Sequence, residues 1–367
     1  MATHPSAPAG SGRSARLAPL VMLIAIVLVV AGLAELAPTV VQRRFTQGLI
    51  NLVAVVGLYV FVGNSGVLSF GNGAFMGIGA YGSALLTMAP AAKGVFLPDL
   101  PEFLAGAQIP VIAGALAGGG AAALVAAVAG FPLMRLSGIS ASIATFAILV
   151  VSYVVLGNWT SVTGGQNSLM GLPIYVGLWT AAAWAVVAII VAFAHQESRT
   201  GLLLRASRED EAAAAASGVD MVRHRLLAFV LSAFLSGISG VLLAHFLGTV
   251  RVETFYLDLT FLIIAMLVIG GTGSLTGAVS GALLITLLTE LLRQAEVGVD
   301  IGATRIAAPA GLGDAILALL MLVIILFRPK GIAGGRELAW PWPRSSGNGA
   351  DDTAAGQPSN SHLKENA

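Results

Sequence analysis

Residues 45–92 read FTQGLINLVAVVGLYVFVGNSGVLSFGNGAFMGIGAYGSALLTMAPAA, which is a run of 48 residues without a charged side chain. A second uncharged run covers the 31 residues 259–289. A helix of about 20 apolar residues is long enough to cross the hydrocarbon core of a bilayer. Inside lipid the backbone must satisfy its own hydrogen bonds, and an α-helix does so within one segment. The two runs therefore predict an all-α integral membrane protein.

The composition of the whole chain supports this fold class. Of its 367 residues, 57% are hydrophobic and 10% are charged, whereas soluble domains carry about 25% charged residues. The net charge of +1 gives no reason to expect a nucleic-acid partner. The chain has no cysteine, which excludes disulfides, thiol catalysis and cysteine-ligated metals.

We expect about ten transmembrane helices with glycine-rich broken segments. The expected spans cover residues 17–37, 46–63, 69–89, 109–130, 139–157, 173–194, 226–249, 259–272, 277–294 and 310–327. The third, eighth and ninth spans border the glycine-rich stretches 63–82 and 270–281, so they could be short, broken or re-entrant. The membrane domain thus covers residues 17–335. The polar tails at 1–16 and 336–367 have the composition of disordered segments.

The first apolar run and the orientation of the chain are linked. Residues 17–36 follow Arg13 and Arg16 and could be a cleaved signal peptide. They exceed the apolar core of about 7–15 residues that signals have, which favours a transmembrane helix. Ten spans place both termini on the side of residues 196–225, and that side carries 13 of the 19 Lys and Arg. Positive residues favour the cytoplasm, so we expect both termini to be cytoplasmic.

A polar segment interrupts the apolar spans. Residues 196–225 read QESRTGLLLRASREDEAAAAASGVDMVRHR and hold ten of the 37 charged side chains. Residues 207–210 fit a shortened capping box, with the serine hydroxyl as the helix cap. Residues 212–216 are alanine, the best helix former, and Gly218 stands where a left-handed residue would end the helix. Asp220 can cap the next helix. We predict a helix of about ten residues that is either a docking surface for a soluble partner or a solvated linker.

Several motifs of the chain resemble those of Liv-type permeases, the membrane subunits of branched-chain amino-acid ABC importers. Glu211-Ala212-Ala213 followed by Gly218 is similar to the "EAA…G" coupling loop of ABC importer permeases, with one more residue before the glycine. The other matches are GVLSFGNGAFMGIGAY at 66–81, RLLAFVLSAFLSG at 225–237, MLVIGGTGSLTGA at 266–278 and FRPKG at 327–331. The chain departs from the family pattern at Asn72, where a His is common, and at Ala278, where a Pro is common.

The resemblance covers about residues 45–335 and implies an ABC importer permease fold in a bacterial inner membrane. It implies a LivM-like subunit that moves branched-chain amino acids, or related small amino acids and amides, inward by alternating access. The implied partners are a second, LivH-like permease subunit, two ATP-binding subunits and an external solute-binding protein. The ATPase-coupling residues it implies are Arg205, Arg208, Glu209, Asp210, Glu211, Ala212, Ala213 and Gly218.

The sequence contains no nucleotide-binding loop of its own. None of its three lysines stands in a G-x-x-x-x-G-K-[ST] frame. We therefore expect no cofactor on this chain, with ATP and Mg²⁺ bound by the partner ATPase subunits. The histidines outside the tails have no metal-binding spacing, and no Ser/His/Asp set follows a known motif, so we predict neither a metal site nor catalysis.

The glycine-rich segments have two interpretations, which are close helix packing and a solute pathway lined by broken helices. Broken helices expose amides and carbonyls that can meet the carboxylate and ammonium of a zwitterion. The candidate pathway residues are Asn51, Ser69, Asn72, Gly73, Gly270, Gly271, Gly273 and Ser274. No ionisable residue falls in the middle of an expected span, which argues against proton coupling. The alternative function is an ATPase-independent secondary carrier or facilitator for small neutral solutes, and a membrane-embedded enzyme is a weaker third.

Overall fold

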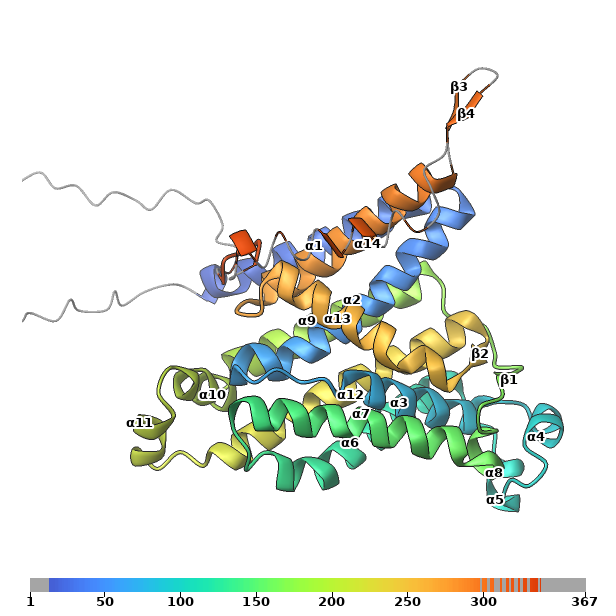
Figure 1. Cartoon of the computed structure of the whole chain (residues 1–367), viewed down its shortest axis with the longest axis horizontal. Helices are drawn as coiled ribbons and strands as arrows, with labels where there is room; N and C mark the ends of the chain where they lie inside the picture. The colour runs from blue at the N-terminus through green and yellow to red at the C-terminus, as the bar shows by residue number, and fades with distance from the viewer. Residues whose placement is uncertain are drawn as a thin grey trace, which may run out of the picture.

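The structure is a computed structural model that describes residues 13–297, 299–301 and 304–306, together with individual residues between 311 and 337. The long helices are α1 (Arg13–Glu35), α2 (Thr39–Ser65), α6 (Val111–Leu133), α7 (Gly138–Asn158), α9 (Leu178–Glu197), α12 (Met221–Leu247), α13 (Leu257–Gly270) and α14 (Leu275–Val297). They lie side by side as a bundle (Figure 1).

The other described elements connect these helices. They are α3 (Asn72–Thr87), α4 (Pro90–Phe96), α5 (Glu102–Ala105), α8 (Thr160–Thr163), α10 (Arg199–Glu209), α11 (Glu211–Ala216) and the 3-10 turn Val252–Phe255. Two short antiparallel pairs complete the described part, namely β1 (Leu169–Met170) with β2 (Thr249–Val250), and β3 (Val299–Ile301) with β4 (Thr304–Ile306).

The expected all-α membrane fold is confirmed, and the expected number of ten spans is approximate. Eight described helices are long and apolar enough to cross a membrane, and they match the expected spans other than the third and the tenth. At the third span, residues 66–71 are not helical and α3 is 16 residues long. That crossing is therefore broken, as its glycines suggested. The expected span 310–327 lies largely outside the described residues.

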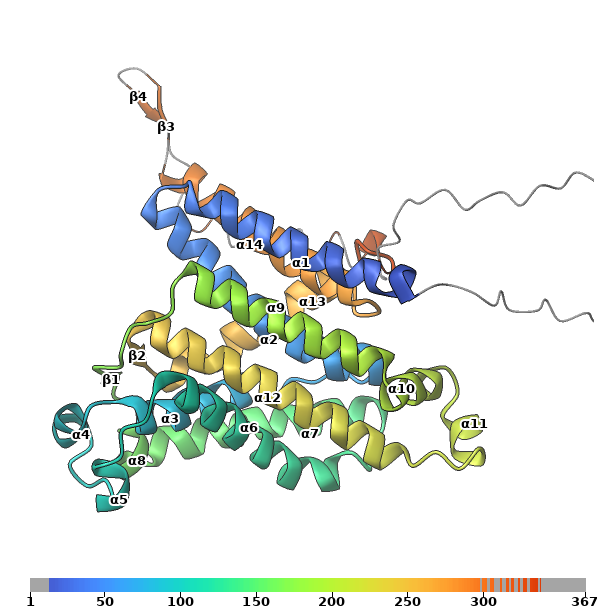
Figure 2. The ribbon, with the colours of Figure 1, turned by 180° about the vertical axis from the view of Figure 1, so that it is seen from behind.

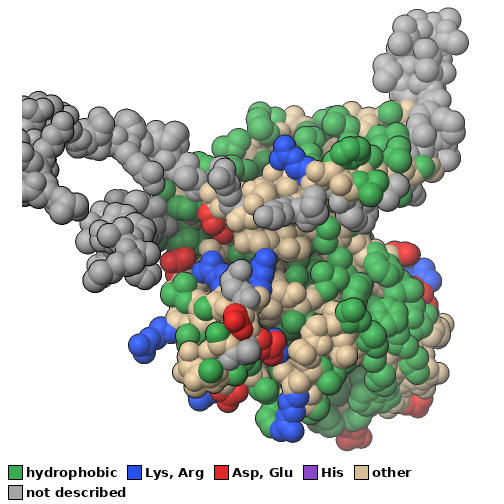
Figure 3. All heavy atoms as spheres, turned by 60° about the vertical axis from the view of Figure 1, so that its left-hand side comes forward, with side chains coloured by type: hydrophobic (Ala, Val, Ile, Leu, Met, Phe, Trp, Pro, Cys, Tyr) green, Lys and Arg blue, Asp and Glu red, His purple; other side chains and the backbone are tan. Residues whose placement is uncertain are grey.

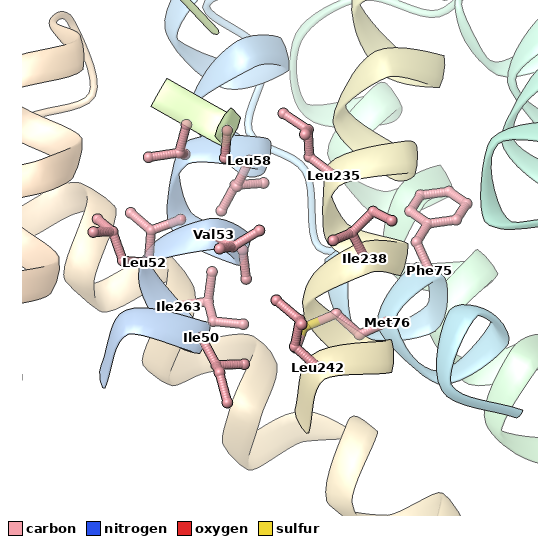
Figure 4. Close-up of a cluster of buried hydrophobic side chains, with 14 of the residues drawn as sticks. Ile50, Leu52, Val53, Leu58, Phe75, Met76, Leu235, Ile238, Leu242 and Ile263 are labelled. Atoms are coloured by element: carbon pink, nitrogen blue, oxygen red, sulfur yellow. The ribbon is translucent and has the colours of Figure 1, made fainter. Parts of the chain in front are cut away.

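Helices α2 and α12 form the centre of the bundle. In the most apolar stretch of each helix, 89% of the residues of α2 and 72% of those of α12 are buried, compared with 17% in α7. A helix that is apolar on all sides belongs in a protein core or against lipid. We therefore assign α7 to the lipid-facing periphery and α2 and α12 to the core. Figure 4 shows the apolar side chains of α2, α3, α12 and α13 that meet in this core.

Small residues bring α3, α6 and α12 together. A Cβ added to Gly118 of α6 would lie 2.5 Å from the carbonyl oxygen of Gly79 in α3, and one added to Gly240 of α12 would collide with the Met76 carbonyl. Because these neighbours are backbone atoms, the helices could not stay at this distance with larger residues. The packing interpretation of the glycines therefore applies to this part of the bundle.

Two hydroxyl groups of α12 join the central helices. Ser239 Oγ donates a hydrogen bond of 2.8 Å to the carbonyl of Ile50 in α2. Ser236 Oγ donates to Asn72 Oδ1 at the start of α3. Hydrogen bonds between membrane helices contribute about 0.6 kcal/mol on average. These two bonds set the register of α2 and α3 against α12.

One end of the bundle is built from α4, α5, α8 and the β1–β2 pair (Figures 1 and 2). Lys93 of α4 is buried there, and its ammonium donates to the carbonyls of Ala107 and, at 2.8 Å, of Leu104. Burial lowers the pKa of Lys93. His245, at the end of α12, bonds Ser83 at 3.0 Å and the Pro173 carbonyl at 3.0 Å. These contacts close the loops over the helix ends.

The opposite end of the bundle carries α10, α11 and the first turn of α1 (Figures 1 and 2). The described residues near 331–337 also lie there, because the amide of Ile332 donates to the Ile269 carbonyl at 2.9 Å. Helix α1 begins at Arg13, four residues before the expected start of the membrane domain, and Glu337, beyond its expected end at 335, makes the contacts described below.

Candidate functional site

Helix α10 is fixed to the bundle by its first turn and by two arginines. Ser198 caps the helix, because its Oγ accepts from the amide of Gly201 at 3.2 Å. Arg208 Nη1 donates to the carbonyl of Gly63 in α2 at 3.1 Å. Arg205 Nη2 donates to the carbonyl of Gln196 at the end of α9, at 2.5 Å. These two bonds connect α10 directly to the ends of α2 and α9.

Helix α11 is shorter than expected, and its cap is a different residue. The Asp210 carboxylate accepts from the amide of Ala213 at 2.9 Å, so Asp210 is the N-cap of α11. The expected cap, Ser207, lies inside α10 and donates to the Leu204 carbonyl at 2.6 Å. The expected helix of about ten residues is thus a break at Asp210 followed by the six residues of α11. An aspartate accepts amide bonds at a helix start as well as serine does, and the sequence offered both.

The predicted end of the short polar helix at Gly218 is confirmed. Gly218 has a φ of 80°, the left-handed conformation that closes α11. Asp220 caps α12 through the amide of Arg223 at 3.1 Å. An ion pair of 2.9 Å joins Glu211 to Arg225, whose side chain is 8% exposed. Glu209 and Ala212 are also expected coupling residues, and the structure describes their backbone but not their side chains.

The surface of α11 is open to solvent. Ala213, Ala215, Ala216 and Gly218 are exposed, while Ala214 packs toward the bundle. Figure 3 shows Lys, Arg, Asp and Glu side chains gathered at this end of the molecule, beside a largely hydrophobic flank. Small exposed side chains let a partner approach the backbone of α11 closely. Because α10 is bonded to α2 and α9, this exposed surface is held at a defined place on the bundle.

A carboxylate that the sequence did not indicate links this end of the bundle. Glu337 accepts from the amides of Leu275 and Thr276, at 2.9 and 3.2 Å, and so caps the start of α14. Its Oε1 also accepts from Gln196 Nε2 at 3.1 Å. Gln196 in turn accepts from Tyr59 Oη of α2 at 2.8 Å. Glu337 therefore connects α14, α9 and α2 next to the root of α10.

The structure separates the expected pathway residues into three places. Residues 270–274 form the turn between α13 and α14, where Ser274 Oγ accepts from the Gly277 amide at 3.0 Å. A Cβ added to Gly331 would collide with Gly271, so the turn is packed against residues 331–335. This turn therefore serves helix capping and packing.

The second place is the start of α3 and the third is the middle of α2. Ser69 Oγ accepts from the Gly71 amide at 3.4 Å, and Gly73 packs against Thr260. Asn72, also in this group, is bound to α12 as described above. Asn51 of α2 is 4% exposed, and its Oδ1 accepts no hydrogen bond from a described residue. Asn51 lines a cavity of about 210 Å³ between α2, α13 and α14.

Comparisons with known proteins identify the family. A family model described as "Branched-chain amino acid transport system / permease component" matches residues 40–325. The high-affinity branched-chain amino acid permease protein LivM of Escherichia coli K12 is 28% identical over 321 residues, covering 78% of this chain and 68% of LivM. LivH of Salmonella typhimurium is 24% identical over 315 residues, covering 80% and 94%.

A permease protein of a different import system also matches in part. The autoinducer 2 import permease protein LsrC of Klebsiella pneumoniae is 32% identical over 166 residues, covering 42% of this chain and 48% of LsrC. No solved structure matches the chain. The family model covers well over half of the sequence, and its span includes α9, α10, α11, α12 and nearly all of α2. The chain therefore belongs to the branched-chain amino acid transport system permease family.

Proposed function

We propose that this chain couples ATP hydrolysis on partner subunits to the inward movement of branched-chain amino acids, or of related small amino acids and amides. Its relatives are permeases of import systems and not enzymes, so the chain is a permease subunit of an ABC importer. The same relatives do not favour the alternative of an ATPase-independent carrier. ATP and Mg²⁺ bind to the separate ATPase subunits in this proposal.

The observation that carries the proposal is the exposed helix α11, held at one end of the bundle by α10. The closing of two ATPase subunits pushes on α11. The push reaches α2 through the bond from Arg208 to Gly63 and reaches α9 through the bond from Arg205 to Gln196. Because α2 lies at the centre of the bundle, its movement changes which end of the pathway is open.

The proposed setting follows from charge and family. The end with α10 and α11 faces the cytoplasm of a bacterial inner membrane, because most Lys and Arg lie on that side. The partners are a second, LivH-like permease subunit, two ATPases below α11 and a solute-binding protein at the opposite end. Relatives of both permease types support a hetero-pair.

The test places a bulky residue on the exposed face of α11. Ala215→Trp should abolish co-purification of the ATPase subunits and reduce leucine uptake at least tenfold, because the indole fills the space that a close partner needs. Ala91→Trp is the matched control for co-purification of the ATPases, since Ala91 is an exposed alanine of the short helix α4 at the opposite end. Retention of the ATPases and normal uptake by Ala215→Trp would contradict the docking role of α11.

A second measurement tests the transport function itself. The complete assembly in proteoliposomes should take up leucine only under two conditions. ATP must be supplied on the side of the ATPase subunits, and the binding protein must be present on the opposite side. Uptake that continues when the ATP site of the partner subunits is mutated would support a carrier and overturn the proposal.

A further inference from the structure

The cavity that contains Asn51 lies in the half of the bundle farthest from α11, at the start of α2 and the end of α14. Its volume is about 210 Å³. The lining residues that matter for its chemistry are Arg44, Asn51, Leu262, Met266, Glu290 and Arg293. No sequence motif pointed to this combination, because its members come from three helices that are far apart in the chain.

Helical spacing places the polar members on one stripe of each helix. Arg44 and Asn51 are seven residues apart on α2, which is two helical turns and about 10 Å of rise. Glu290 and Arg293 are one turn apart on α14 and face the same side. Arg44 lies exposed at the rim and Asn51 is buried below it, so the cavity runs from a charged mouth to an amide.

The charges of the mouth are only partly matched within the described residues. Arg293 binds the Glu290 carboxylate with two bonds, at 2.5 and 3.0 Å, and Gln294 adds a third at 3.0 Å. Arg44 acts on the same carboxylate only at longer range and makes no hydrogen bond or ion pair with a described residue. One positive charge is therefore left available at the mouth.

The mouth of the cavity offers a positive charge, whereas its floor offers a hydrogen-bond acceptor. Asn51 Oδ1 is buried and lacks a donor among the described residues. A buried acceptor without a partner is unfavourable, so a ligand that donates an N–H to it gains affinity from that bond. Leu262 and Met266 supply an apolar wall on α13 beside it.

We propose that this cavity is a subsite for a zwitterionic amino acid with an aliphatic side chain, on the side of the permease where solute enters. The guanidinium of Arg44 receives the carboxylate, Asn51 Oδ1 accepts from the ammonium, and the side chain lies against Leu262 and Met266. The inference rests on the proposed function, and it adds the place where this chain itself meets the solute.

A lipid phosphate is the other ligand that an arginine at a membrane surface could hold. The Glu290 carboxylate beside Arg44 and Arg293 leaves the mouth with one net positive charge, which suits a single carboxylate. A headgroup phosphate would also leave Asn51 Oδ1 without a donor, because a phosphate group offers oxygen acceptors and no N–H. The geometry therefore favours the amino acid.

The first test uses the complete transporter in proteoliposomes, with uptake and ATP hydrolysis measured together. Arg44→Gln and Asn51→Leu should each lower the leucine imported per ATP about tenfold, the factor expected for one lost charge-assisted hydrogen bond. ATP hydrolysis stimulated by the binding protein should persist. Arg43→Gln is the matched control, because the neighbouring guanidinium lies over the Phe246 ring at 5.3 Å, outside the cavity.

The second test uses the natural absence of cysteine from the chain. Thr289 is exposed and lines the cavity, so a thiol in Thr289→Cys should react with a charged methanethiosulfonate. Millimolar leucine should slow that reaction several-fold, and the protection should disappear when Arg44→Gln is added. Val95→Cys on α4 is the control for reagent access, because Val95 is exposed away from the cavity.

The outcomes separate this proposal from the proposed function. If the unaltered assembly imports leucine but Arg44→Gln and Asn51→Leu import as much per ATP, the function stands and the subsite is wrong. Protection of Thr289→Cys by vesicles rich in phosphatidylglycerol, and not by leucine, would replace the amino acid with a lipid and overturn the subsite. If Asn51→Leu does not assemble, Arg44→Gln and the protection assay still decide.

Discussion

Gly118 and Gly120 lie two positions apart in α6 and have different surroundings. A Cβ on Gly118 would lie 2.5 Å from the Gly79 carbonyl oxygen and 2.8 Å from Val241, whereas a Cβ on Gly120 would meet nothing within 4 Å. Both glycines belong to one run in the sequence, and the run alone does not distinguish them. The partner helices α3 and α12 make one of them necessary.

Gly118→Ala should destabilise the protein by about 1–3 kcal/mol, because a methyl group forced against backbone separates α6 from α3. Gly120→Ala should be neutral or stabilise by about 0.5–1 kcal/mol, since alanine is the better helix former. Thermal unfolding of the two variants in detergent, followed by a helical signal, measures the difference. Equal melting temperatures would show that the α3–α6 seam can move apart freely.

Arg208 and Arg199 provide a second matched pair, both on α10. Arg208 binds the Gly63 carbonyl, whereas Arg199 is exposed and binds no described residue. Arg208→Met keeps the aliphatic stem and removes the bond to α2, so uptake per ATP should fall about fivefold for a loss near 1 kcal/mol. Arg199→Met should leave this ratio unchanged. The ratio is measured in proteoliposomes with the full assembly.

Helices α10 and α11 show how far local rules reach. Capping by Asp220, the end at Gly218 and the helical alanine run involve residues within four positions of each other, and the structure agrees with all three. Ser207 was predicted as a helix cap because the residues around it, which lie inside α10, also satisfy the rules for a helix start. The helix continues past Ser207 to Arg208, which bonds Gly63 of α2, 145 positions away in the sequence.

Asp210→Ala should destabilise α11 by about 1 kcal/mol. It removes the side chain that caps this six-residue helix, and the described residues offer α11 no other side-chain cap. Hydrogen exchange of the amides of residues 213–216 should then speed up about fivefold. Ser207→Ala should leave these amides unchanged, since its hydroxyl bonds a carbonyl inside α10. Faster exchange in Ser207→Ala instead would restore the serine as the cap.

In the molecule as a whole, Glu337 joins elements that are distant in sequence. It receives two amides of α14 and the side chain of Gln196, which also binds Tyr59 of α2. A carboxylate at a helix start interacts favourably with the helix dipole as well as with the amides. Glu337 thereby links α14, α9 and α2 at the end of the bundle that carries α10 and α11.

Glu337→Ala should lower the free energy of unfolding by about 1–3 kcal/mol, because it leaves helix-end amides and Gln196 without their acceptor. It should also reduce the uptake per ATP, since α9 and α14 are no longer joined. Glu102→Ala, an exposed glutamate in the first turn of α5, is the control for losing a carboxylate. A melting temperature unchanged in Glu337→Ala would mean that the capping of α14 is redundant with Ser274.

Membrane insertion, the approximate number of spans, the broken third crossing and the short polar helix ending at Gly218 follow from the sequence. These properties depend on runs of apolar residues, on glycine and on capping residues within a turn of each other, so neighbouring positions carry the information. The family motifs add the ATPase-coupled role, because the EAA-like loop is contiguous in the chain.

The cavity around Asn51, the Glu337 cap and the bond between Arg208 and Gly63 depend on the folded molecule. Each joins residues more than 60 positions apart, and the helix faces that meet there are almost uniformly apolar, so periodicity does not reveal which faces pair. Packing of glycine against backbone selects the neighbours, and these neighbours then place a few polar groups together. For this reason the coupling loop was visible in the sequence, and the cavity was visible only in the fold.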